Sequence, residues 1–115
     1  MDRITQYRQI VKALITKYAQ LKPAYGEIEI KSLFDETHDQ YQLLYVGWDK
    51  YQRIHNVILH IELRGSAQNC KVWIQYDGIE GGVAEELVQA GIPRENIVLG
   101  FHPENVRRFT EYAVA

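Results

Sequence analysis

The run R-I-H-N-V-I-L-H-I-E-L-R, Arg53–Arg64, decides the fold class, because apolar and polar side chains alternate along it. Alternation with a period of two is typical of a β-strand that buries one of its faces. One predicted face is apolar and consists of Val57, Leu59, Ile61 and Leu63. The other predicted face is mixed and consists of Asn56, Ile58, His60 and Glu62. We therefore expect one side of this strand in the core and the other at a partly polar surface.

Further strand-like runs surround this one and predict a sheet. They span Glu27–Phe34, Tyr41–Trp48 and Lys71–Tyr76, and the joints carry turn residues, as in D-E-T-H-D and R-G-S-A-Q-N. Short joints favour antiparallel neighbours, so we expect a meander of four strands. The apolar run Asn96–Gly100 follows a helical stretch, and this return predicts a fifth strand that is parallel to its neighbour.

Helical periodicity precedes and follows the meander. In the first 21 residues, apolar side chains recur in steps of three and four at Ile4, Tyr7, Val11, Leu14, Tyr18 and Leu21. This pattern predicts a long amphipathic helix, with Asp2 as its N-cap and Lys22–Gly26 as its end. Its apolar face either binds a partner or covers the sheet, and covering the sheet is favoured in a small domain. A second helix is expected from Gly82 to Gly91, because Pro93 cannot continue it.

The expected fold is therefore α+β. It is a single domain, residues 1–115, with a long N-terminal helix on a mostly antiparallel sheet of four to five strands and a second helix near the C-terminus. The only cysteine, Cys70, excludes an internal disulfide and favours a reducing cytoplasm. A net charge of −2 without a basic cluster argues against strong direct nucleic-acid binding. No apolar run is long enough for a membrane, and no export signal is expected at the start.

The acidic, glycine-rich stretch D-G-I-E-G-G, Asp77–Gly82, has two interpretations. A phosphate loop usually adds a lysine, and here Asp77 and Glu80 would repel phosphate unless a divalent cation lay between them. The favoured interpretation is a helix start, in which Asp77 caps and Glu80 lies in the first turn. The alternative is a small ligand-binding or metal-dependent enzyme domain with a site at Asp77, Glu80 and His60.

No catalytic residue, metal-ligand set or cofactor is predicted. His55 and His60 are five residues apart on one strand, and we expect them on opposite faces, where they cannot bind one metal ion together. His60 and Glu62 share a predicted face, but that local set lacks a nucleophile. Cys70 at the start of a strand is more typical of a small buried apolar residue than of a reactive thiol.

The fourth strand indicates an interaction surface. Lys71, Trp73 and Gln75 alternate with Val72, Ile74 and Tyr76, so that one face is core and the other is mixed with an exposed tryptophan. The predicted partner-interface residues are Lys71, Trp73, Gln75 and His60. They favour a non-enzymatic protein that binds a companion and itself, as a homodimer. A third hypothesis, direct DNA binding, requires one basic stripe formed by Arg53, Lys71, Arg107 and Arg108.

Several strings together carry a resemblance to a known family. They are G-W at Gly47-Trp48, R-I-H-N-V-I-L-H-I at Arg53–Ile61, K-V-W-I-Q-Y-D-G-I-E at Lys71–Glu80 and E-L-V-Q-A-G-I-P-R-E-N-I-V-L-G-F-H-P at Glu86–Pro103. With these strings the chain resembles, over nearly its whole length, the XisI-like family of cyanobacteria. That family is named for a factor that controls excision of a DNA element interrupting a nitrogen-fixation gene.

The resemblance implies a regulatory function without established catalytic residues. The implied partners are a companion protein, XisH, which resembles restriction-type nucleases, and a site-specific recombinase. Ile79 stands where the family tends to have threonine. Since Ile79 has no hydroxyl group to cap a helix, the capping function is expected to fall to Asp77.

Overall fold

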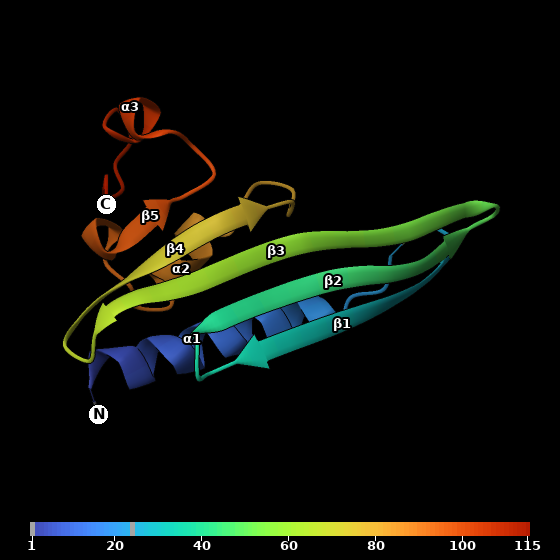
Figure 1. The fold of residues 1–115 in the computed structure, drawn as a ribbon, viewed down its shortest axis with the longest axis horizontal. Coiled ribbons are helices and arrows are strands. Elements are labelled where there is room, and N and C mark those ends of the chain that lie inside the picture. Colours follow the sequence, from blue (N-terminus) through green and yellow to red (C-terminus); the bar gives the residue numbers. More distant parts are fainter. Residues whose placement is uncertain (1, 24) are drawn as a thin grey trace.

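A five-stranded sheet in the order β1-β2-β3-β4-β5 is the frame of the molecule, and helices cover one of its faces (Figure 1). We describe it from a computed structural model that covers residues 2–23 and 25–115. The elements are α1 (Arg3–Ala19), β1 (Glu27–Asp35), β2 (Gln40–Asp49), β3 (Gln52–Ser66), β4 (Asn69–Asp77), α2 (Ala84–Gln89), the 3-10 turn η1 (Arg94–Asn96), β5 (Ile97–Leu99) and α3 (Glu104–Arg107). β1 to β4 pair as an antiparallel meander, and β5 lies parallel to β4. The α+β fold is confirmed.

Helix α1 covers the sheet, as its amphipathic pattern predicts. Asp2 is its N-cap, and its carboxylate accepts a hydrogen bond of 2.9 Å from the Thr5 backbone N–H. The side chains that α1 buries against the sheet are Tyr7, Val11, Leu14 and Ile15. Leu21 departs from the pattern: the helix ends at Ala19, the chain turns away before Leu21, and its side chain is 55 % exposed.

A β-bulge divides β3 into two halves whose side chains alternate in opposite phase. Leu43 of β2 pairs with Leu59, but the next residue, Leu44, pairs with Val57, so that Ile58 has no partner on β2. Because residues directly opposite each other share a face, Val57 lies on the face opposite to Leu59 and is 37 % exposed. The prediction that Val57 shares the core face is therefore wrong.

A second bulge lies between β3 and β4. His60 pairs with Tyr76, whereas Ile61 pairs with Ile74, which leaves Gln75 as the extra residue of β4. Tyr76 therefore shares the face of His60 and is 51 % exposed, although strict alternation predicts it beside Ile74 in the core. In both cases one inserted residue reverses the alternation beyond it.

The end of α2 fixes the return to β5. The N–H of Gly91 donates to Val88 and the N–H of Ile92 donates to Leu87, each at 3.0 Å, which is the Schellman arrangement. Gly91 has φ +117° and Ile92 is fully buried, so the predicted helix end is confirmed. β5 then places Ile97 and Leu99 in the core beneath α1 and α2. No helix in the described part of the chain is both long and apolar enough to span a bilayer.

Candidate protein-interaction surface

The face of the sheet that points away from α1, here called the outer sheet face, is uncovered over β1, β2 and β3 (Figure 1). The strand registers place a set of apolar side chains on it, each exposed or half-buried: Leu33, Leu44, Val46, Trp48, Val57 and Tyr76. Polar side chains stand among them, including Lys31, Gln42 and His60. A mixed, uncovered sheet face of this kind can form the apolar centre and polar rim of a protein interface.

Over β4 and β5 the outer sheet face is covered by residues 100–115, here called the C-terminal segment. The segment leaves β5 at Gly100, where an added Cβ would lie 2.7 Å from Gln75 Oε1 and 3.2 Å from the Trp73 ring. It returns to the sheet at Ala113, whose N–H donates to the Ile97 carbonyl at 2.8 Å. Lys71 is tied to the same segment, because its ammonium group donates to the main-chain oxygen of Ala115.

The predicted interface residue Trp73 lies beneath this segment. Two guanidinium groups lie over its ring, that of Arg64 at 4.2 Å from the ring centroid and that of Arg107 at 5.2 Å. Arg107 also donates to the main-chain oxygens of His102 and Val114, which holds it in place. The expectation of an exposed tryptophan is therefore wrong, since Trp73 is half-buried by a contact distant in sequence.

The predicted interface residues Gln75 and His60 share this face, and each is hydrogen-bonded to a different neighbour. Gln75 donates to Glu62 at 2.8 Å, and a His60 ring nitrogen lies 2.7 Å from the Gln40 side-chain oxygen. Burial lowers the pKa of His60, and the nearby charge of Glu62 opposes that shift only in part. His60 is therefore neutral at pH 7 and offers one N–H donor. Lys71, Trp73, Gln75 and His60 thus lie on one face, at the border between the covered and the open parts of the outer sheet face.

The acidic turn after β4 is held together by Asp77. One carboxylate oxygen accepts from the Ile79 N–H at 3.1 Å, and the other accepts from the Val83 N–H at 2.8 Å, at the start of α2. The helix begins later than predicted, with Val83 as its N-cap and no side-chain cap, so the prediction that Asp77 caps it is wrong. Glu80 accordingly lies exposed in the preceding turn and not in the first helical turn. Asp77 acts across six residues because Gly81 and Gly82, at φ +84° and +78°, fold the turn back onto it.

We expect Asp77→Ala to lower the free energy of unfolding by about 1–2 kcal/mol, because two backbone N–H groups lose their acceptor. Glu80→Ala is the matched control, since it removes an exposed carboxylate from the same turn and should change stability by less than about 0.5 kcal/mol. Urea unfolding followed by circular dichroism measures both. Equal effects of the two substitutions would contradict the function of Asp77 as the acceptor that holds this turn together.

The alternative ligand-site residues Asp77, Glu80 and His60 are not brought together. His60 is paired with Tyr76 on the outer sheet face, whereas Asp77 is paired with Leu59, whose side chain lies in the core. Both oxygens of Asp77 are already hydrogen-bonded, and Glu80 points into solvent. Within residues 2–23 and 25–115, no group of three or more His, Cys, Asp or Glu side chains is arranged to hold a metal ion.

The bulge in β3 also changes the positions of two histidines. His55 pairs with Val46 and His60 pairs with Gln42, and these partners share one face of β2, so both histidines lie on the outer sheet face. The prediction of opposite faces is wrong, although four intervening residues still separate them along the strand. Cys70 is fully buried, and burial raises the pKa of its thiol, as expected for a structural cysteine.

The basic residues of the DNA-binding hypothesis do not form one stripe. Arg53 stands at one end of β3, opposite Trp48, with its guanidinium 5.4 Å from that ring. Lys71 pairs with Arg64 at the other end of β3. Arg107 lies over Trp73, on the strand of Lys71, so Arg53 is at the other end of β3 from Lys71 and Arg107.

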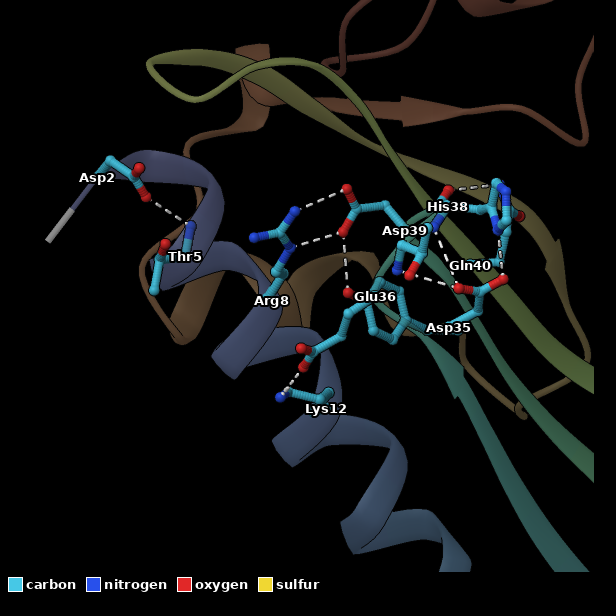
Figure 2. Close-up of polar contacts among 11 residues, drawn as sticks. Asp2, Thr5, Arg8, Lys12, Asp35, Glu36, His38, Asp39 and Gln40 are labelled. Carbon is cyan, nitrogen blue, oxygen red and sulfur yellow. Dashed lines mark hydrogen bonds and ion pairs between the residues drawn. The ribbon is translucent and has the colours of Figure 1, made fainter.

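A polar cluster that joins α1 to the β1–β2 turn has no signal in the sequence pattern (Figure 2). Arg8 donates to both oxygens of Asp39 at 2.7 and 3.1 Å, and the buried Tyr41 hydroxyl donates to the same carboxylate at 2.9 Å. One turn further along the helix, Lys12 pairs with Glu36. Arg8 and Asp39 are 31 positions apart, and Lys12 and Glu36 are 24 positions apart, so no local spacing links helix and turn. This cluster fixes the helix on the sheet and leaves the outer sheet face free.

The fold and this surface define a small α+β domain whose sheet is bare on one face over β1–β3. A family model described as XisI protein matches residues 1–114. A crystal structure of a XisI-like protein from Anabaena variabilis has 34 % sequence identity and a TM-score of 0.88, and the match covers 98 % of this chain and 100 % of that one.

A second crystal structure, of the fdxN element excision controlling factor XisI from the same organism, has 34 % identity and a TM-score of 0.83. The match covers 99 % of this chain and 100 % of that one. A comparison with curated proteins gave no match. The chain belongs to the XisI family.

Proposed function

We propose that the protein controls the excision of a DNA element without catalysing a reaction, by binding protein partners through its outer sheet face. Its family membership and its likeness to a protein named as an excision controlling factor support the excision function. The observation that carries the mode of action is the outer sheet face, which is bare over β1–β3 and half apolar. Large apolar side chains on a rigid, uncovered sheet are typical of binding surfaces.

The first partner is an XisH-like companion, and a site-specific recombinase is the second. A regulator with a net charge of −2 has little general attraction for DNA, so contact with a DNA-acting protein is the simpler route to the element. His60 and Tyr76 are paired at the edge of the open area, and Val57 lies further along the same face. Lys71, Trp73 and Gln75 border this area, and their contacts with the C-terminal segment keep its edge in place.

Co-purification with the XisH-like companion tests this function. Val57→Glu places a carboxylate in the middle of the outer sheet face and should lower the affinity at least about 100-fold, because an unpaired charge would be buried. Gln6→Glu is the matched control, since it adds the same group at an exposed position of α1, on the other side of the sheet. Trp73→Ala should weaken binding less, through loss of the packed C-terminal segment.

Two results would contradict the proposal. One is a wild-type chain that forms no complex with the companion or with the recombinase. The other is a complex that tolerates Val57→Glu as well as it tolerates Gln6→Glu. Thermal unfolding of each variant alone should show that the fold is kept, because Val57 is already 37 % exposed in the free protein.

A further inference from the structure

Strand β1 is a long edge strand whose outer side has no neighbour among the described residues. It is paired along its whole length with β2, from Glu27 opposite Trp48 to Asp35 opposite Gln40, and this pairing has no bulge. Its other side is open at the lower rim of the sheet in Figure 1. Natural edge strands are usually short, bulged or interrupted by proline, because their free N–H and C=O groups pair readily with another chain. β1 has nine residues without a bulge or a proline, and its only protection of this kind is its charged side chains.

Apolar side chains flank the open edge on both faces of the sheet. Leu33 is 51 % exposed on the outer face, and Phe34 is 39 % exposed on the side of α1. Ile28 and Ile30, also on the side of α1, are half-buried. A strand added to this edge would therefore gain backbone hydrogen bonds and would remove apolar surface from water on both faces.

The charges of β1 select a second copy of the chain as that strand, in one register. Two copies of β1 can pair antiparallel about a two-fold axis that is perpendicular to the sheet. Residues opposite each other must then point to the same face of the sheet, so the axis lies between the two copies of one residue. An axis at Glu29 or at Lys31 would place that charge opposite itself. An axis at Ile30 places Glu29 of each copy opposite Lys31 of the other, in two symmetric pairs. An axis at Leu33 would also form two pairs, of Lys31 with Asp35, but the two strands would then overlap only over residues 31–35, whereas the axis at Ile30 lets them overlap over residues 27–33. Within one chain, Glu29 and Lys31 already lie 2.9 Å apart on the outer face, so the four charges form one alternating cluster.

We propose that β1 pairs antiparallel with β1 of a second copy, with Ile30 opposite Ile30, so that the two sheets become one continuous sheet. The outer sheet faces of both copies then lie on the same side of the dimer, and both remain open. The interface lies along the edge of β1 and takes up Lys31 and Leu33 at the border of the outer sheet face, whereas Val57, His60 and Tyr76 lie on strands away from it.

Charge reversal tests the register. Analytical ultracentrifugation of the full chain over a range of concentrations should show a dimer, and Glu29→Lys or Lys31→Glu should raise its dissociation constant at least about tenfold, because like charges then face each other. The double variant Glu29→Lys/Lys31→Glu should restore the wild-type constant. A monomeric wild type, or a double variant as weak as the single variants, would overturn the proposal.

Cross-linking gives a second measurement that does not depend on charge. Ile30→Cys should form an intermolecular disulfide on mild oxidation, because the two Cα atoms at the axis would be about 5 Å apart. Ile28→Cys, on the same face but opposite Ser32 in this register, is the matched control and should stay reduced. The native Cys70 is fully buried and does not interfere. Cross-linking at position 28 but not at position 30 would overturn the register.

Discussion

Replacing Leu59 by alanine is expected to lower the free energy of unfolding by about 3–5 kcal/mol, the largest single effect that we predict. Leu59 is fully buried in β3, which has a neighbouring strand on each side, and it lies opposite Leu43, which is also fully buried. Leu59 has a strand partner on each side, Leu43 and Asp77, so neighbouring strands limit how far the cavity can collapse. Urea unfolding measures the loss.

Two controls accompany Leu59→Ala. Leu21→Ala removes the same atoms from a side chain that is 55 % exposed, and it should change stability by less than about 1 kcal/mol. Val57→Ala compared with Val72→Ala tests the bulge in β3, because Val57 is 37 % exposed and Val72 is fully buried. Only the substitution at Val72 should be clearly destabilising. Equal losses at the two valines would contradict the reversed alternation in β3.

We expect stability to fall steeply at alkaline pH, chiefly because of Tyr41. Burial raises the pKa of this phenol, and its hydrogen bond to Asp39 raises it further. An unfolded tyrosine ionises near pH 10, whereas the folded chain keeps the proton, so the stability present below pH 10 is lost as the pH rises above it. Tyr41 alone contributes a slope of about 1.4 kcal/mol per pH unit. Burial and bonds to Glu86 and Glu85 also raise the pKa of Tyr18 and Tyr112 to about 12 each, in the same direction.

Tyr41→Phe isolates this effect. At neutral pH the variant should lose about 1 kcal/mol with the hydrogen bond to Asp39. Between about pH 10 and about pH 12, its stability should fall less steeply than that of the wild type, by about 1.4 kcal/mol per pH unit. Urea unfolding at a series of pH values gives both slopes. Parallel slopes for the two proteins would show that Tyr41 ionises equally in the folded and unfolded chains.

The parts of the fold that could be predicted from the sequence are those with a local cause. The spacing of Tyr7 and Val11 predicts α1, short joints predict the meander, and the A-G-I-P string predicts the end of α2. The bulge at Gln75 could not be predicted, because this residue fits an unbroken alternating pattern. At Ile58 the three consecutive apolar residues Val57–Leu59 do interrupt the alternation, but they do not specify which residue lacks a partner. Each bulge is specified by the fit between neighbouring strands.

The candidate surface was predictable only in part, for a similar reason. Strand alternation correctly places Lys71 and Trp73 on one face, and His60 shares it. The cover over Trp73 comes from Arg107, which lies 34 positions later in the numbering (107 − 73), through an ordinary loop without a distinctive composition. The Arg8–Asp39 pair is also distant in sequence, with 31 positions between the two residue numbers. Contacts between residues so far apart in the sequence form only in the assembled sheet, and the periodicity of the sequence does not predict them.

The uneven cover of the sheet gives the molecule a closed end and an open end. At β4 and β5, helices lie on one face and the C-terminal segment on the other, whereas the strands β1 to β3 have helix cover on a single face. We expect amide hydrogens of β4 to exchange only through large-scale opening, whereas those of the edge strand β1 can exchange through local fraying. The closed end therefore keeps the fold stable, and at the open end β1 can gain or lose a neighbouring strand without unfolding of the rest of the sheet.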